Sequence, residues 1–210
     1  MSGKQLWSAA LAVVVLVSGL ATAQEEKNQL TGIVGRTFVS NQGIKGATFS
    51  NPFIRFGNGF TFEVDYSRYL ITSPIFALSG EVPVVFNLDQ DINSGANVVP
   101  SHYSSYFITP AARVNLLPAA AVSPWVSFGG GFGHFSENGS LISGGTNPGK
   151  SKTTGVLQGG LGLDVRIWRR ISIRGEVRDF WSGEPDFPLA PTGKTRQHNL
   201  FVGAGATWHF

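Results

Sequence analysis

Alternation of apolar and polar residues over eight segments is the feature that most restricts how this chain can fold. The second segment shows the pattern: one face carries Phe60, Phe62, Val64 and Tyr66, and the other carries Thr61, Glu63, Asp65 and Ser67. A period of two residues is that of a β-strand, and we find no helical stripe from residue 28 onward. The eight segments lie at about 28–39, 59–71, 76–89, 104–117, 124–136, 153–168, 171–182 and 196–210. We therefore expect an all-β fold.

The connections between these segments alternate in length. Long, polar connections lie near 40–58, 90–103, 137–152 and 183–195, and short ones near 72–75, 118–123 and 169–170. Each segment reaches the roughly 9–11 residues that a tilted strand needs to cross a bilayer. Long loops on one side and tight turns on the other are typical of transmembrane β-barrels. The pattern predicts a closed antiparallel up-and-down barrel of eight strands, with both ends of the barrel domain on the short-turn side.

The composition of the two faces indicates which one meets lipid. The polar face of the segment at 153–168 carries Gln158, Gly160, Gly162 and Asp164, so glycines stand beside a full charge. Small and charged residues together suit a narrow lumen, while the bulky apolar face suits lipid. A soluble lipocalin-like barrel would have the opposite arrangement, with the bulky face inside.

The polar faces carry equal numbers of positive and negative residues. The expected lumen residues are Arg36, Arg113, Arg166, Arg174 and Arg178, together with Glu63, Asp65, Glu81, Asp164 and Glu176. Charges inside a membrane protein are tolerated when they are paired. The balance therefore predicts a lumen filled by a structural ion-pair network rather than a pore of one sign.

Aromatic residues and prolines give two further expectations. Trp125, Trp168, Trp208 and the terminal Phe210 all fall near the short-turn side, where we expect them to form an interfacial aromatic girdle. Pro83 and Pro110 fall inside expected strands of a barrel that has no free edge. We expect a bulge or a rim position at each proline.

The N-terminus reads as a secretory signal peptide over residues 1–23. Lys4 precedes the apolar run 11–17, and Ala21-Thr-Ala23 is a small-residue cleavage site. The run is shorter than the roughly 20 residues of a membrane-spanning helix. We expect cleavage near Ala23, which leaves 24–210 as one barrel domain. The chain has no cysteine, and its charges are scattered, which gives no argument for a nucleic-acid partner.

The last segment carries the clearest family signal. It runs from Leu200 to a terminal Phe210 with Val202, Ala204, Ala206 and Trp208 on the same face as Phe210. This looks like the signal by which outer-membrane barrels engage their assembly machinery. The chain from residue 24 onward resembles the eight-stranded outer-membrane β-barrel family, whose best-known members are OmpA-like transmembrane domains. The resemblance implies the outer membrane of a Gram-negative bacterium, with membrane lipid, lipopolysaccharide and the assembly machinery as partners.

Three local motifs suggest chemistry and have structural readings as well. The segment 144–151 matches the pattern of the phosphate-binding P-loop. A functional P-loop is followed by a helix whose N-terminus holds the phosphates, but here a β-type segment follows. We therefore expect a loop that binds no nucleotide. His134 and Ser136 face the same way on an expected strand, and this stretch is similar to the His-x-Ser stretch of outer-membrane lipid A deacylases. The structural alternative is a polar strand end that enters a loop. The four histidines lack metal-ligand spacing, so we expect no metal and no cofactor.

Three functions remain open at this point. The first is a non-enzymatic barrel with a structural role, or an interaction role carried by its loops. The second is a channel or transporter for small solutes, and the third is a lipid-modifying membrane enzyme. The small strand number and the balanced lumen charges argue against the second. His134, Ser136 and Glu137 could form a nucleophilic site, but Glu137 separates Ser136 from Asn138, unlike the deacylase stretch, which argues against the third.

Overall fold

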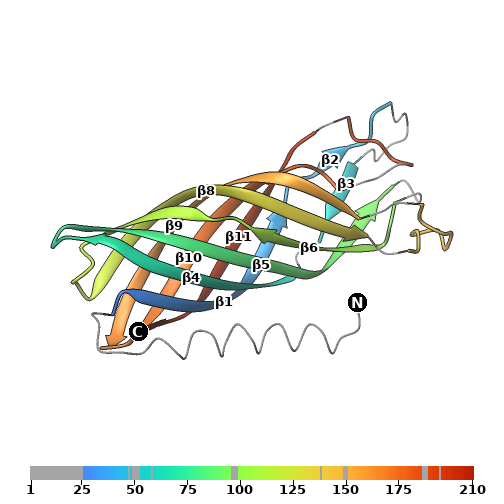
Figure 1. Ribbon diagram of the computed structural model, residues 1–210. Coiled ribbons are helices and arrows are strands. Elements are labelled where there is room, and N and C mark those ends of the chain that lie inside the picture. The colour runs from blue at the N-terminus through green and yellow to red at the C-terminus, as the bar shows by residue number, and fades with distance from the viewer. Residues whose placement is uncertain are drawn as a thin grey trace.

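A computed structural model describes residues 26–46, 48, 53–57, 59–95, 99–137, 139–148, 151–185, 189–193 and 195–210. The expected signal peptide and its cleavage site lie outside these residues. No helix in the described part of the chain has both the length and the apolar character needed to cross a membrane. The fold of this part is built from antiparallel strands (Figure 1).

Eight strands close into a barrel. They are β1 (Asn28–Val39), β4 (Phe60–Thr72), β5 (Phe76–Ser94), the pair β6 (His102–Ile108) and β7 (Ala111–Leu116), β8 (Val122–Glu137), β9 (Lys152–Trp168), β10 (Ile171–Ser182) and β11 (Gln197–His209). β6 and β7 are two halves of one barrel strand. The ring closes because β1 pairs with β11 and β5 pairs with β6 and β7. The predicted closed, antiparallel, eight-stranded barrel is confirmed.

The two ends of the barrel differ as the connection lengths predicted. The turns after β4, β7 and β9 are short and lie at the end where Asn28 and Phe210 exchange backbone hydrogen bonds of 2.9 Å. The long connections gather at the other end (Figure 1). There, β2 (Gln42–Gly43) and β3 (Phe53–Phe56) pair with each other, and β3 also pairs with the last three residues of β5.

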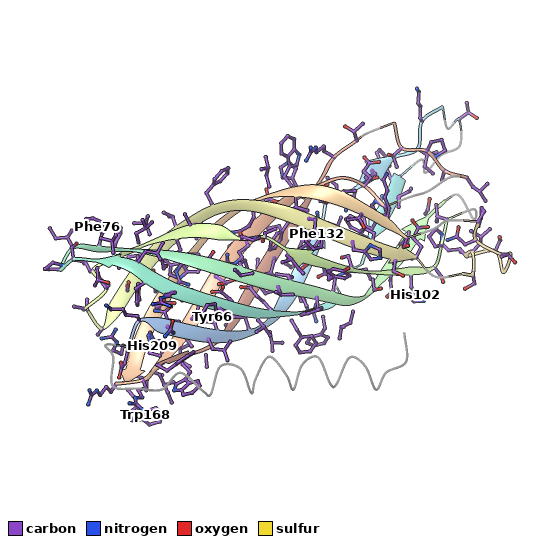
Figure 2. The ribbon with its side chains drawn as sticks, in the orientation of Figure 1. Tyr66, Phe76, His102, Phe132, Trp168 and His209 are labelled. Carbon is purple, nitrogen blue, oxygen red and sulfur yellow. The ribbon has the colours of Figure 1, made fainter. Side chains whose placement is uncertain are left out.

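The outer wall is an apolar belt, as the alternation predicted. Phe60, Leu88, Phe128 and Leu161 are each about 60% exposed or more, and they alternate along their strands with buried polar side chains. Exposed apolar surface of this extent needs a non-aqueous surrounding. Figure 2 shows the side chains that project from the wall along its whole length.

The two prolines lie side by side where one barrel strand is interrupted. Pro110 separates β6 from β7, and the backbone N–H of Thr109 donates to the Pro83 carbonyl at 3.3 Å. In an antiparallel strand the N–H and C=O of one residue point to the same neighbour. Pro83 has no backbone N–H, and an N–H at this position would point to the gap between β6 and β7. The pairing between β5 and its neighbour therefore loses no hydrogen bond at Pro83. β8 comes close at this point, because a Cβ on Gly131 would overlap the Ile108 carbonyl.

The interior has an apolar layer that was not predicted from the sequence. It occupies the long-loop half of the lumen, and it is formed by Ile33, Val85, Phe107, Phe135, Val156, Phe180 and Phe201. The rings of Phe107 and Phe180 stack at 5.1 Å, and Phe135 meets Phe107 edge-on at 5.8 Å. These residues share the inward phase of the polar positions, so the lumen holds packed apolar side chains in one half and ion pairs in the other.

Candidate functional site

The ion-pair network in the short-turn half of the lumen is the principal candidate site. Three arginines form its centre: Arg113 from β7, and Arg174 and Arg178 from β10. The side chains of all three are fully buried. Five carboxylates surround them, and these are Glu63 and Asp65 of β4, Glu81 of β5, Asp164 of β9 and Glu176 of β10. The alternation of each strand turns these side chains inward.

Arg178 holds three carboxylates from three strands. Its Nη1 donates to Glu81 Oε1 at 2.6 Å, its Nε donates to Glu176 Oε1 at 2.7 Å, and Nε lies 3.3 Å from Glu63 Oε1. Ser127 Oγ accepts a further hydrogen bond from Nη1 at 3.3 Å. Short contacts between charged groups in a buried site are among the stronger interactions in proteins. Arg178 therefore ties β4 and β5 to β10 across the lumen.

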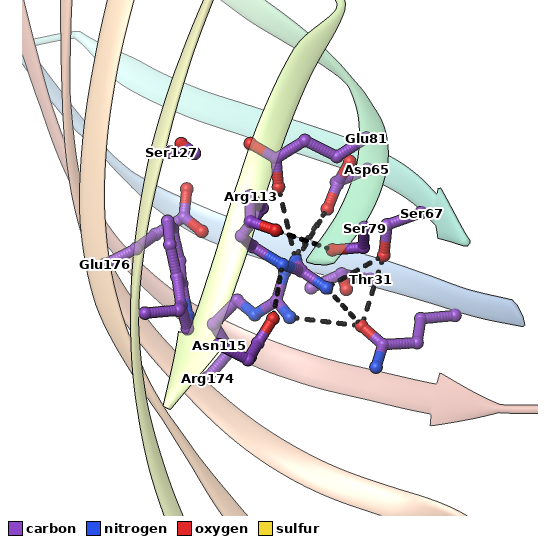
Figure 3. Close-up of polar contacts among 12 residues, drawn as sticks. Thr31, Asp65, Ser67, Ser79, Glu81, Arg113, Asn115, Ser127, Arg174 and Glu176 are labelled. Carbon is purple, nitrogen blue, oxygen red and sulfur yellow. Dashed lines mark hydrogen bonds and ion pairs between the residues drawn. The ribbon is translucent and has the colours of Figure 1, made fainter. Parts of the chain in front are cut away.

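Arg174 and Arg113 complete the network through a shared carboxylate (Figure 3). Arg174 makes a two-pronged contact with Asp164, with Nε and Nη2 donating at 2.7 and 2.9 Å. Asp65 Oδ2 lies 3.2 Å from Arg174 and 3.5 Å from Arg113. Arg113 also lies 3.3 Å from Glu81, so every arginine shares at least one carboxylate with another arginine. The network is therefore one connected unit.

Trp125 lies inside this network, which corrects the expectation that it belongs to the aromatic girdle. Only 2% of Trp125 is exposed, and the guanidinium carbons of Arg113, Arg174 and Arg178 lie 5.6, 5.2 and 5.1 Å from its ring centre. Its indole N–H donates to Asp164 at 3.3 Å. A buried cation over an indole face is a favourable contact.

The phase of β8 accounts for the position of Trp125. Trp125 is in phase with Ser123 and Ser127, which face inward, while Val126 and Phe128 face outward. On the neighbouring strand β9, Gly162 pairs with Trp125, and a Cβ on Gly162 would lie 2.6 Å from Trp125 Cε2, so glycine at this position leaves room for the indole. The polar residues two positions before and after Trp125 indicate in the sequence that it faces inward. The expectation that it belongs to the girdle rests on its residue type alone.

Arg36 and Arg166 do not join the network, which corrects two further expectations. Arg36 is exposed on the outer wall of β1, in phase with Val34 and Phe38, and stands 5.8 Å from the ring centre of Phe60. Arg166 has the inward phase of Asp164 but lies beyond the network at the short-turn mouth, where its Nη2 donates to the Pro118 carbonyl at 3.3 Å. Of the ten predicted lumen charges, the structure brings the other eight together.

The lumen charges are therefore unequal in number. Three arginines face five carboxylates, which corrects the expected balance of five of each sign. Because the carboxylates outnumber the arginines, each arginine is costly to lose: its removal leaves the carboxylates around it with fewer cations.

The remaining girdle residues lie at the short-turn rim. Trp168 is 68% exposed and Trp208 is 46% exposed, and the rings of Trp208 and Phe210 stack at 4.8 Å. Trp168 projects from this end of the barrel in Figure 2. The structure thus brings three of the four predicted aromatic residues to one rim.

The other sequence motifs lie on the long-loop side. His134 Nδ1 lies 2.8 Å from Thr153 Oγ1, and its ring packs on Tyr106 at 5.3 Å. Ser136 is exposed on the same outer face, and no carboxylate contacts His134 among the described residues. Residues 149 and 150 of the P-loop-like segment lie outside the described residues, and the strand β9 follows it. No group of three or more possible metal ligands is found in the described ranges.

Replacing Arg178 with methionine tests the role of the network in stability. The change leaves Glu63, Glu81 and Glu176 without their shared cation, so we expect the free energy of unfolding to fall by about 3–5 kcal/mol. Urea titration of the protein refolded in lipid vesicles would measure it. The matched control is Arg36→Met on the outer wall, for which we expect a change below about 1 kcal/mol. Equal losses in the two variants would contradict a stabilising network.

Comparison with known proteins agrees with the geometry. Residues 9–210 match the family described as outer membrane protein beta-barrel domain. The structure resembles Neisserial surface protein A, with a TM-score of 0.58 and 11% identity over 87% of this chain and 97% of that one. It also resembles OprG from Pseudomonas aeruginosa, with a TM-score of 0.53 and 9% identity over 88% and 95% of the two chains. At these identities the likeness concerns the fold alone.

A search of curated proteins gives no match. The family match covers nearly the whole chain, and the closed barrel, its apolar wall and its paired lumen charges agree with it. The chain therefore belongs to the outer membrane protein β-barrel domain family, and it is an outer-membrane β-barrel of Gram-negative bacteria.

Proposed function

We propose that this barrel is a non-enzymatic protein with a structural role or an interaction role carried by its extracellular loops, and that its lumen does not conduct. The filled lumen is the observation that supports this. The arginine–carboxylate network fills the periplasmic half, and the stacked rings of Phe107 and Phe180 lie in the extracellular half. A conducting path would have to cross both layers, and a small barrel filled by side chains leaves no aqueous channel.

The arrangement of the extracellular loops supports an interaction role. The Lys45 N–H of the first loop donates to the Pro191 carbonyl of the fourth at 2.8 Å, and the Ile142 N–H of the third donates to the Val99 carbonyl of the second at 3.0 Å. Below them, Tyr103 packs edge-on against Phe56 at 5.6 Å. Loops held on a rigid scaffold are where binding residues concentrate in proteins.

The proposal includes a route of export and insertion, which rests on the sequence of residues 1–23 and of the last strand. We infer that residues 1–23 are cleaved after Ala23 and that the strand ending at Phe210 engages the assembly machinery. The intact mass of the protein purified from outer membranes should correspond to a chain that starts at Gln24. A mass that includes residues 1–23 would contradict the cleavage.

Conductance separates a closed scaffold from a channel. In planar bilayers we expect the refolded wild type to give no sustained single-channel currents, because two packed layers block the lumen. A variant with Phe107→Ala, Phe180→Ala and Arg178→Ala removes part of both layers and serves as the positive comparison. Sustained, large currents from the wild type would show that the proposal is wrong and would favour the small-solute channel.

Lipid A profiling tests the absence of enzymatic activity. His134 and Ser136 lie on the outer wall near the extracellular end, where a lipid-modifying enzyme would meet its substrate. His134 contacts the Thr153 hydroxyl rather than a carboxylate, so the group that would orient it as a general base is missing from its contacts. We expect cells that express the wild type, Ser136→Ala or His134→Ala to have the same lipid A pattern. A modification present with the wild type and lost in both variants would establish an enzyme.

A further inference from the structure

We propose that the periplasmic rim over strands β4, β1, β11, β10 and β9 is a binding surface for anionic glycerophospholipids of the inner leaflet. We call this surface the basic–aromatic rim, and its residues are Tyr66, Arg68, Trp168, Arg169, Arg170 and Trp208. It is separate from the loops on which the proposed function depends, because it lies at the opposite end of the barrel (Figure 1).

The aromatic residues of this rim lie on one continuous row across five strands. Tyr66 of β4 pairs with Leu30 of β1, and Leu30 pairs with Trp208 of β11. Trp208 pairs with Ile171 of β10, which pairs with Trp168 of β9. With neighbouring strands ~4.8 Å apart, the row covers roughly 19 Å of the wall.

All three aromatic side chains in the row face outward. Tyr66, Trp208 and Trp168 are 38%, 46% and 68% exposed, and the Tyr66 hydroxyl donates to Asn28 Oδ1 at 2.9 Å. Rings with an apolar body and a polar edge prefer the boundary between acyl chains and headgroups. The row therefore marks the level of the inner-leaflet interface on this side of the barrel.

The cations of the rim lie just beyond this row, on the periplasmic side. Arg68 is exposed two residues past Tyr66, and Arg169 and Arg170 form the turn that follows Trp168. The Arg169 and Arg170 side chains are 91% and 65% exposed. From these positions long basic side chains reach headgroup phosphates while the aromatic rings stay at the acyl boundary.

The charge of the rim determines which lipid it fits. Among the described residues of the rim, Glu26 is the one carboxylate side chain, and it lies 3.6 Å from Arg169 and 3.4 Å from Arg170. The three arginines of the rim therefore outnumber the acidic side chains described beside them. Guanidinium groups bind phosphate oxygens in a two-pronged geometry, and basic clusters beside a membrane attract anionic lipids. A headgroup that carries a phosphate and no amine has a net negative charge, so it is attracted to these arginines more strongly than a zwitterionic headgroup is.

Selective quenching of tryptophan fluorescence tests the proposal. The full barrel is refolded into phosphatidylcholine nanodiscs that contain a small share of brominated phosphatidylglycerol or brominated phosphatidylcholine. All proteins start at Gln24, so that they lack Trp7, and all carry Trp181→Phe, so that Trp168 and Trp208 are the exposed indoles and Trp125 stays buried. We expect stronger quenching by the anionic lipid in the parent protein, weakening as salt screens the charges.

The rim variant combines Arg68→Gln, Arg169→Gln and Arg170→Gln. We expect the association constant for phosphatidylglycerol, relative to phosphatidylcholine, to fall about tenfold. The matched control removes three exposed cations near the other end through Arg36→Gln, Arg55→Gln and Lys152→Gln, and it should keep the parent selectivity. Heat-modifiable gel migration verifies that each variant is folded.

Three outcomes would overturn the proposal. The first is equal quenching by the two brominated lipids in the parent protein, a comparison that needs no variant to fold. The second is a control variant that loses as much selectivity as the rim variant. The third is a tighter association with lipid A than with phosphatidylglycerol that disappears in the rim variant, which would assign the surface to a different lipid.

Discussion

The pairing of charges inside a narrow, closed wall is the constraint on which the rest of this structure depends. Arg113, Arg174 and Arg178 are buried completely, and a buried guanidinium is tolerated only with carboxylates in contact. The carboxylates come from β4, β5, β9 and β10, so the network joins strands that are far apart around the ring. Trp125 lies over all three guanidinium groups and fills the remaining space.

This network and the aromatic layer above it occupy different halves of the lumen. The ionic half fixes how opposite walls face each other through directional contacts, and the apolar half excludes water by packing. Both depend on small residues where a bulky group must fit, as Gly162 shows beside Trp125. The two ends of the barrel differ: the loops at one end are joined by backbone hydrogen bonds, and the outer wall at the other end carries a row of aromatic side chains with arginines beyond it.

Two expectations from the sequence fail for the same physical reason. The charge of Arg36 predicts a place in the lumen and the aromatic ring of Trp125 predicts a place in the girdle, although the neighbours of each indicate the opposite phase. In β1, Val34 and Phe38 face outward with Arg36, and in β8, Ser123 and Ser127 face inward with Trp125. Near an interface the residue type is a poor guide, because long cations reach water from the outer wall and indoles pack inside on arginines. Arg166 had the correct phase but lies beyond the network, at the level of the turn.

The sequence by itself determined the strand number, the alternation of long and short connections, and the apolar wall. These are local properties, because a period of two residues and the length of a segment are read within one strand. The tertiary structure alone decided which charges meet, since Asp65 reaches both Arg113 and Arg174 only through the register and closure of strands distant in sequence. It also decided that the missing N–H of Pro83 meets the interruption at Pro110, and that Tyr66, Trp208 and Trp168 form one row. Contacts of this kind depend on how strands are staggered around a ring, which no single strand encodes.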